Sequence, residues 1–105
     1  MRLLESFLLA NLQAARKLSS QGFEFEVSEI GNLEHLPKCS VNISSDRFLC
    51  NLTMWSSGEC DLHVTDDHAD QVLINETSVF NEEVEILKYL ENAYGRLQDI
   101  HHGAS

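Results

Sequence analysis

Basic residues are scarce in this 105-residue sequence: seven Lys and Arg stand against 17 Asp and Glu, which gives a formal net charge of -10 at pH 7. A chain with so few cations lacks the basic stripe that nucleic-acid phosphates and anionic membranes require. We therefore expect no nucleic acid and no membrane among its partners. The acids are spread through patterned sequence and are not gathered into a tail, so they predict a folded domain with a negative field whose natural partner is a basic protein surface.

Long apolar runs are also missing, and none approaches the about 20 residues that a membrane-spanning helix needs. The first 18 residues include Glu5, Arg16 and Lys17 and have no small-residue cleavage site. This start predicts an amphipathic helix and not a signal peptide. We expect a cytoplasmic protein that folds as a single domain over residues 1–105.

Cysteine is scarce and odd in number, because only Cys39, Cys50 and Cys60 are present. Three cysteines do not make a fully paired disulfide framework. They lack the short Cys-x-x-Cys spacing that is typical of zinc sites, which would need His35 or His63 as further ligands. We interpret them as reduced, buried thiols and predict no metal and no cofactor.

Catalytic signatures are absent as well. There is no glycine-rich phosphate loop and no nucleophile elbow, and the acidic run at residues 66–70 has no glycine, unlike a calcium-binding EF-hand loop. The scattered carboxylates alternate outward, away from the burial that shifts a catalytic pKa. A histidine pointing outward opposite an inward cysteine does not form a dyad. The sequence therefore favours a protein that is not an enzyme and has no catalytic residues.

What remains is a clear pattern of secondary structure. Apolar residues at three- and four-residue spacing predict a helix from residue 2 to about residue 20, which Gly22 ends, and a second helix near the C-terminus that Ser78 or Asn81 caps. The apolar stripes comprise Leu3, Leu4, Phe7, Leu8, Leu12, Ala15 and Leu18 in the first helix and Phe80, Val84, Leu87, Leu90, Tyr94 and Leu97 in the second.

Alternation of apolar and polar residues predicts about five antiparallel strands between the helices. The first strand begins near Phe23, residues 31–38 form a connecting loop, and residues 66–70 form a polar turn. The last strand spans residues 71–76, with Val72 and Ile74 pointing inward.

The central hairpin allows its register to be derived. If residues 56–58 form a three-residue loop with Gly58 in the left-handed conformation, Met54 pairs with Cys60 and Leu52 pairs with Leu62. A two-residue loop would instead bury Asp61 and His63 against the core, at a cost of about 1 to 3 kcal/mol each. We therefore predict the three-residue loop.

One face of this sheet is apolar, so both helices must cover that face, which gives a two-layer α+β domain: helix, five-stranded antiparallel meander, helix. The other face stays uncovered. By alternation it carries acids around one large aromatic residue, and its expected members are Glu24, Glu26, Asn42, Asn51, Thr53, Trp55, Glu59, Asp61, His63 and Thr65.

Trp55 is the sharpest local feature of that face, because tryptophan is enriched at binding hot spots. Two interpretations are open. The indole either anchors a partner or folds over the edge of the sheet and covers a neighbouring strand or loop.

The segment at residues 53–64, with Trp55, Gly58 and Asp61 spaced as Trp-x-x-Gly-x-x-Asp on a hairpin, resembles small bacterial immunity proteins of polymorphic toxin and contact-dependent inhibition systems, most of all the TriTu-type immunity family. The resemblance continues through a helix entry at residues 76–80 and a Leu87-x-x-Leu90 stripe, over the last two-thirds of the chain. It implies a non-enzymatic antidote that binds the C-terminal domain of one cognate toxin, often a nuclease.

Two further hypotheses remain beside immunity. One is a type III secretion chaperone, which is small, acidic and dimeric and needs an exposed apolar groove; the other is a small hydrolase that uses carboxylates. We expect a monomer that binds its protein partner through one acidic surface. The expected contact residues are Trp55, Glu24, Glu26, Glu59, Asp61, His63, Asp66 and Asp67.

Overall fold

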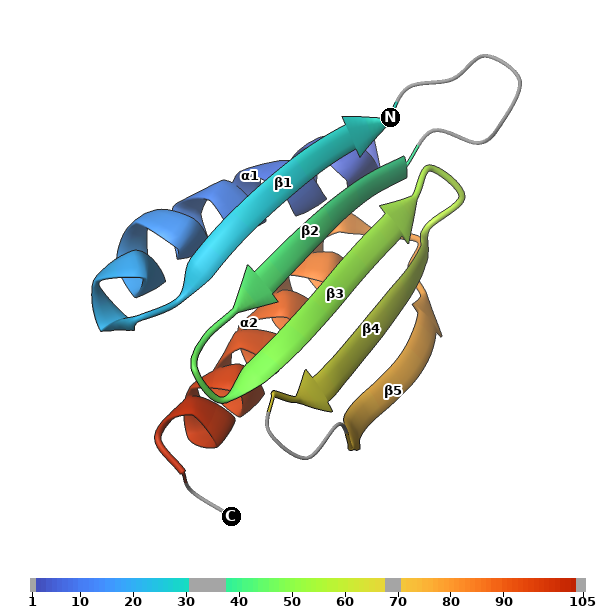
Figure 1. Ribbon diagram of the computed structural model, residues 1–105. Helices are drawn as coiled ribbons and strands as arrows, with labels where there is room; N and C mark the ends of the chain where they lie inside the picture. The colour runs from blue at the N-terminus through green and yellow to red at the C-terminus, as the bar shows by residue number, and fades with distance from the viewer. Residues whose placement is uncertain (1, 31–37, 68–70, 104–105) are drawn as a thin grey trace.

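A computed structural model describes residues 2–30, 38–67 and 71–103. The chain forms a helix, five strands and a second helix (Figure 1). The elements are α1 (Arg2–Leu18), a short 3-10 turn (Ser19–Gln21), β1 (Glu24–Ile30), β2 (Lys38–Ser44), β3 (Phe48–Trp55), β4 (Glu59–Asp66), β5 (Val72–Val79) and α2 (Glu83–His101). Gly22 follows the 3-10 turn with φ of 98°, the left-handed conformation expected at the end of the first helix.

The five strands form one antiparallel sheet in the order β1-β2-β3-β4-β5, so each strand pairs with its neighbours in sequence. Figure 1 looks onto one face of this sheet, and both helices lie behind it. The apolar side chains that point toward the helices make the core, together with Phe7 and Leu18 of α1 and Leu90 and Leu97 of α2. The predicted α+β meander, with both helices on one face, is confirmed.

The β3–β4 hairpin has the predicted register, with Met54 opposite Cys60 and Leu52 opposite Leu62. Gly58 has φ of 95°, and its N–H donates to the Trp55 carbonyl oxygen at 2.9 Å. The Gly58 carbonyl in turn accepts a hydrogen bond of 2.9 Å from the Phe80 N–H. The turn therefore fixes the hairpin and also ties it to the segment that leads into α2.

The predicted end of the last strand was wrong. β5 continues to Val79 and so includes most of residues 76–80, which were expected to begin the second helix. A bulge between Val64 and Thr65 places Val72 opposite Thr65, on the uncovered face, so Val72 is exposed and does not point inward. Ile74 packs against the core as predicted.

The second helix begins at Glu83 and not near Phe80. Glu82 is its N-cap and forms a capping box with Glu85, in place of the predicted caps Ser78 and Asn81. The buried stripe is Ile86, Leu90, Ala93 and Leu97. Val84 and Leu87 were wrongly assigned to it, because the sequence contains two overlapping apolar stripes and only one of them faces the sheet.

The first helix buries a polar residue that the pattern did not predict. Asn11 is fully buried, donates from Nδ2 to the Phe7 carbonyl at 2.8 Å and accepts a hydrogen bond from the Tyr94 hydroxyl. Leu12, which was expected in the apolar stripe, is exposed. The contact between Asn11 and Tyr94 joins the two helices side by side beneath the sheet.

Two predicted connections lie mostly outside the described residues. Of the loop expected at residues 31–38, the structure describes only Lys38, which begins β2. Of the polar turn expected at residues 66–70, it describes Asp66, the last residue of β4, and Asp67.

Candidate functional site

The sheet face turned away from the helices, here called the outer face, holds the candidate site. Register places its side chains in rows that cross the strands. The first row is Glu26, Asn42, Asn51, His63 and Asn75; the second contains Ser40, Thr53, Asp61 and Thr77; the third contains Lys38, Trp55, Glu59 and Val79.

Neutral polar side chains occupy the centre of the outer face and bond to one another. Asn51 Nδ2 donates to Asn42 Oδ1 at 2.9 Å and to Ser40 Oγ at 3.1 Å. The Thr53 hydroxyl donates to Asn51 Oδ1 at 2.9 Å and lies 2.9 Å from Ser40 Oγ. Thr53 is only 7% exposed, so this network is a fixed, largely satisfied surface and not a set of free ligands.

Trp55 lies in the third row, at the end of β3, and its side chain is partly exposed. Lys38, directly opposite on β2, holds its ammonium nitrogen 5.9 Å from the centre of the indole ring. Such a cation–π contact at an exposed site contributes about 0.5 to 1 kcal/mol. The contact keeps the indole over the outer face with part of its surface in solvent.

Two of the predicted acids lie beside this indole. Glu59 follows the turn after Trp55 and is exposed, and Asp61 lies one row further along β4. The Asp61 carboxylate accepts a 2.8 Å hydrogen bond from the Thr77 hydroxyl of β5. Val79 completes this group opposite Glu59, with 65% of its surface exposed. We call Trp55, Glu59, Asp61 and Val79 the Trp55 corner.

The other predicted contact residues are more distant. Glu24 and Glu26 are exposed on β1, at the opposite edge of the sheet, and His63 is exposed in the first row. Asp66 lies opposite the buried Phe48, seven residues along β3 from Trp55, which is about 23 Å at ~3.3 Å per residue. The structure therefore brings together Trp55, Glu59 and Asp61 but places Asp66 and Asp67 at the far end of the sheet.

Sequence reasoning did not identify Val79 as part of the site, because residues 76–80 were assigned to a helix. Hydrophobic alternation gave no signal here, because Glu76 and Ser78 are polar like Asn75 and Thr77. The available signal was composition, since Thr77 and Val79 are β-branched and favour a strand.

The cysteines are not placed for chemistry. Cys39, Cys50 and Cys60 are thiols buried on the helix side of the sheet, whereas His63 points to the outer face. Burial raises the pKa of both the Cys50 and the Cys60 thiol to about 12, so neither forms a reactive thiolate near neutral pH. His35 lies outside the described residues, and among those described no three His, Cys, Asp or Glu side chains gather as a metal site.

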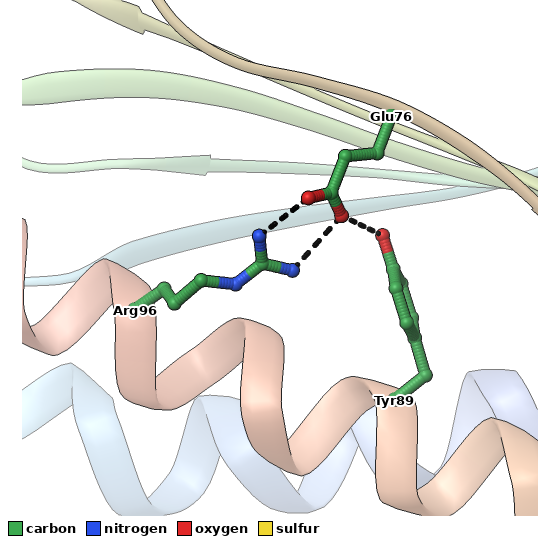
Figure 2. A network of polar contacts seen from close by, with 3 residues as sticks. All are labelled: Glu76, Tyr89 and Arg96. Carbon is green, nitrogen blue, oxygen red and sulfur yellow. Dashed lines mark hydrogen bonds and ion pairs between the residues drawn. The ribbon is translucent and has the colours of Figure 1, made fainter.

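A polar clamp fixes β5 to the helix layer (Figure 2). Arg96 of α2 donates to both carboxylate oxygens of Glu76, at 2.7 and 3.0 Å, and the Tyr89 hydroxyl donates to Glu76 at 2.9 Å. The Arg96 guanidinium lowers the pKa of Glu76, and burial together with the Glu76 carboxylate raises the pKa of Tyr89. The clamp points away from the outer face and holds the strand that borders the Trp55 corner.

Neither helix, over the residues that the structure describes, is long and apolar enough to cross a membrane.

A comparison with protein families identifies the chain. The model of the family described as immunity protein TriTu matches residues 7–94, from α1 through all five strands into α2. The chain belongs to the TriTu immunity protein family. This match begins earlier than the resemblance seen in the last two-thirds of the sequence, and it includes the whole Trp55 corner. No curated protein matches the chain.

Membership in a family of immunity proteins assigns the general role, which is to neutralise a toxin protein. The cognate partner is therefore a protein.

Proposed function

We propose that this immunity protein binds a cationic toxin domain through its outer face, with the Trp55 corner at the centre of the contact. One observation carries the proposal: a partly exposed indole lies beside Glu59 and Asp61 on a sheet face that neither helix covers. Tryptophan supplies the large apolar contact that dominates binding energy at hot spots, and the acids orient a basic partner.

The remaining predicted residues have secondary roles in this proposal. His63 extends the contact along β4, and Glu24 and Glu26 meet the rim of the partner on β1. Asp66 and Asp67, about 23 Å from Trp55, act on a cationic partner through the long-range field and not by contact.

The partner that fits this surface is the C-terminal domain of a secreted toxin whose own substrate is anionic, such as a nuclease. A toxin that holds nucleic acid displays Lys and Arg, and a rigid acidic surface occupies them in place of the phosphates. The protein acts in the cytoplasm as a monomer, by binding and without catalysis.

Affinity capture from the native host, followed by mass spectrometry, tests the proposal. The wild-type chain should retain one large toxin fragment, and the Trp55→Ala, Asp61→Lys double variant should lose it. The expected decrease in affinity is about a hundredfold or more, measured by calorimetry with the captured toxin domain.

A double variant on the helix side, Val84→Ala with Glu91→Lys, is the matched control. It truncates an exposed valine and reverses one exposed acid, so the net charge changes equally while the outer face stays intact. Equal loss of binding in both double variants would contradict the assigned surface. Retention of many unrelated effectors would instead identify a secretion chaperone.

A further inference from the structure

β5 is the last strand of the sheet, and among the described strands it pairs only with β4. It has eight residues and is therefore ~26 Å long. Alternate residues of such a strand direct N–H and C=O groups away from the sheet, where another extended segment can pair with them. Natural proteins usually protect such an edge with proline, lysine or other charged side chains.

The β5 edge lacks these protections. Its sequence, VLINETSV, has no proline and no lysine, and its single charged residue is Glu76. That carboxylate is turned toward α2 and held by Arg96 and Tyr89 (Figure 2). At the other edge of the sheet, the sequence of β1 contains Glu24, Glu26 and Glu29. Among the described residues, the β5 edge therefore carries no charge other than the paired Glu76, whereas Glu24 and Glu26 are exposed on β1.

Apolar side chains border the β5 edge at both ends. Val72 and Leu73 are 53% and 39% exposed at its start, and Val79 is 65% exposed at its end. An added strand would cover these side chains, and the Glu76 clamp keeps β5 in place while it pairs.

Charge decides which segment fits. Glu59 lies opposite Val79, Asp61 lies opposite Thr77, and Glu82, Glu83 and Glu85 follow β5 in the chain. A second copy of this protein would bring a further net charge of -10 to this edge, whereas a basic segment is attracted to these acids.

We propose that the β5 edge takes up an extended segment of the toxin domain as an additional strand of the sheet. The segment carries an apolar side chain beside Val79 and long basic side chains that reach across β5 toward Glu59 and Asp61 on β4. This inference rests on the proposed function and extends the Trp55 corner around the edge of the sheet.

Charge substitutions of both signs at Val79 test the inference. Val79→Lys and Val79→Glu are measured by calorimetry against the toxin domain captured above, with Val84→Lys and Val84→Glu as controls. Both valines are exposed, but Val84 lies on α2. If an added strand packs on Val79, either charge weakens binding by about tenfold or more, while the Val84 variants change it by less than about threefold.

Because Val79 also belongs to the Trp55 corner, amide hydrogen exchange on the same complex supplies the readout that distinguishes an added strand from contact at the corner alone. Binding should slow, by about tenfold or more, the exchange of the alternate β5 amides that do not bond to β4, and these amides should exchange fast in the unbound protein. This measurement does not depend on any substitution, so it holds even if a Val79 variant folds poorly.

The other outcomes contradict the inference in distinct ways. Weaker binding with Lys and stronger binding with Glu would mean that position 79 affects binding only through long-range electrostatic attraction and that no strand packs on it. Unchanged binding and exchange at β5, with loss of binding in the Trp55→Ala, Asp61→Lys variant, would leave the proposed function standing and overturn the β5 edge. Sedimentation of the unbound chain as a dimer that Val79→Lys dissociates would assign the edge to a second copy. Failure to capture any toxin domain would overturn both proposals.

Discussion

Glu76 is the residue on which the attachment of β5 to the helix layer depends. Its carboxylate accepts hydrogen bonds from Arg96 and Tyr89, and the side chains of Arg96 and Glu76 are 31% and 40% exposed. Exposure of this order screens the ion pair, so most of its contribution comes from the geometry of two parallel hydrogen bonds. The clamp therefore stabilises the fold modestly and positions β5 firmly.

Replacing Glu76 with Gln should lower the free energy of unfolding by about 1 kcal/mol at neutral pH, because charged hydrogen bonds become neutral ones. Arg96 lowers the pKa of Glu76 in the folded state. The contribution is thus complete above the ordinary pKa range of glutamate and is lost as the pH falls through the folded pKa. Urea unfolding of both proteins across this pH range checks the prediction.

Glu91→Gln provides the control, since Glu91 is an exposed acid on the same helix. Removing that charge from a chain of net charge -10 should leave stability equal or slightly higher. A gap between wild type and Glu76→Gln that persists at low pH would show that the ion pair is not its source.

At the scale of elements, the β3–β4 turn requires glycine at position 58. A Cβ at Gly58 would overlap the Phe80 carbonyl oxygen, and its φ of +95° is unfavourable for other residues. Gly95, on α2, has no atom within 4 Å of the position that a Cβ would take.

The two glycines should respond to alanine in opposite directions. Gly58→Ala should destabilise the protein by about 3 kcal/mol or more, because strain and overlap add. Gly95→Ala should stabilise it by about 0.5 to 1 kcal/mol, because alanine favours a helix interior. Urea unfolding of both variants measures this difference, and similar values for the two would contradict the assigned turn.

The β3–β4 hairpin could be predicted from the sequence, and the junction between β5 and α2 could not. The hairpin register follows from strict alternation and one glycine, so the pairing of Met54 with Cys60 can be derived from the residues alone. The junction between β5 and α2 cannot, because residues 76–80 fit either pattern and the hydrogen bond from Phe80 to Gly58 is a tertiary contact. Of the site, alternation placed Trp55, Glu59 and Asp61 on one face, whereas the bulge that turns Val72 outward left no mark in the sequence.

At the scale of the whole molecule, the net charge of -10 should have opposite effects on folding and on binding. Salt screens repulsion within the free protein and also screens attraction to a cationic toxin. Raising ionic strength from about 0.05 M to about 0.5 M should therefore raise the melting temperature of the unbound chain and slow association by about tenfold or more. Thermal melts measure the first effect, and stopped-flow mixing with the captured toxin domain measures the second. An association rate that does not change with salt would mean that the net charge does not contribute to binding.

The hydrogen-bonded centre of the outer face has a consequence for how such a protein changes partner. Asn42, Asn51 and Thr53 satisfy one another's polar groups, so covering them commits no donor to a particular ligand. Discrimination between toxins then falls to the surrounding positions, such as Glu59 and Val79. A few substitutions there would redirect the inhibitor to a different toxin. The fold and its stability would not change.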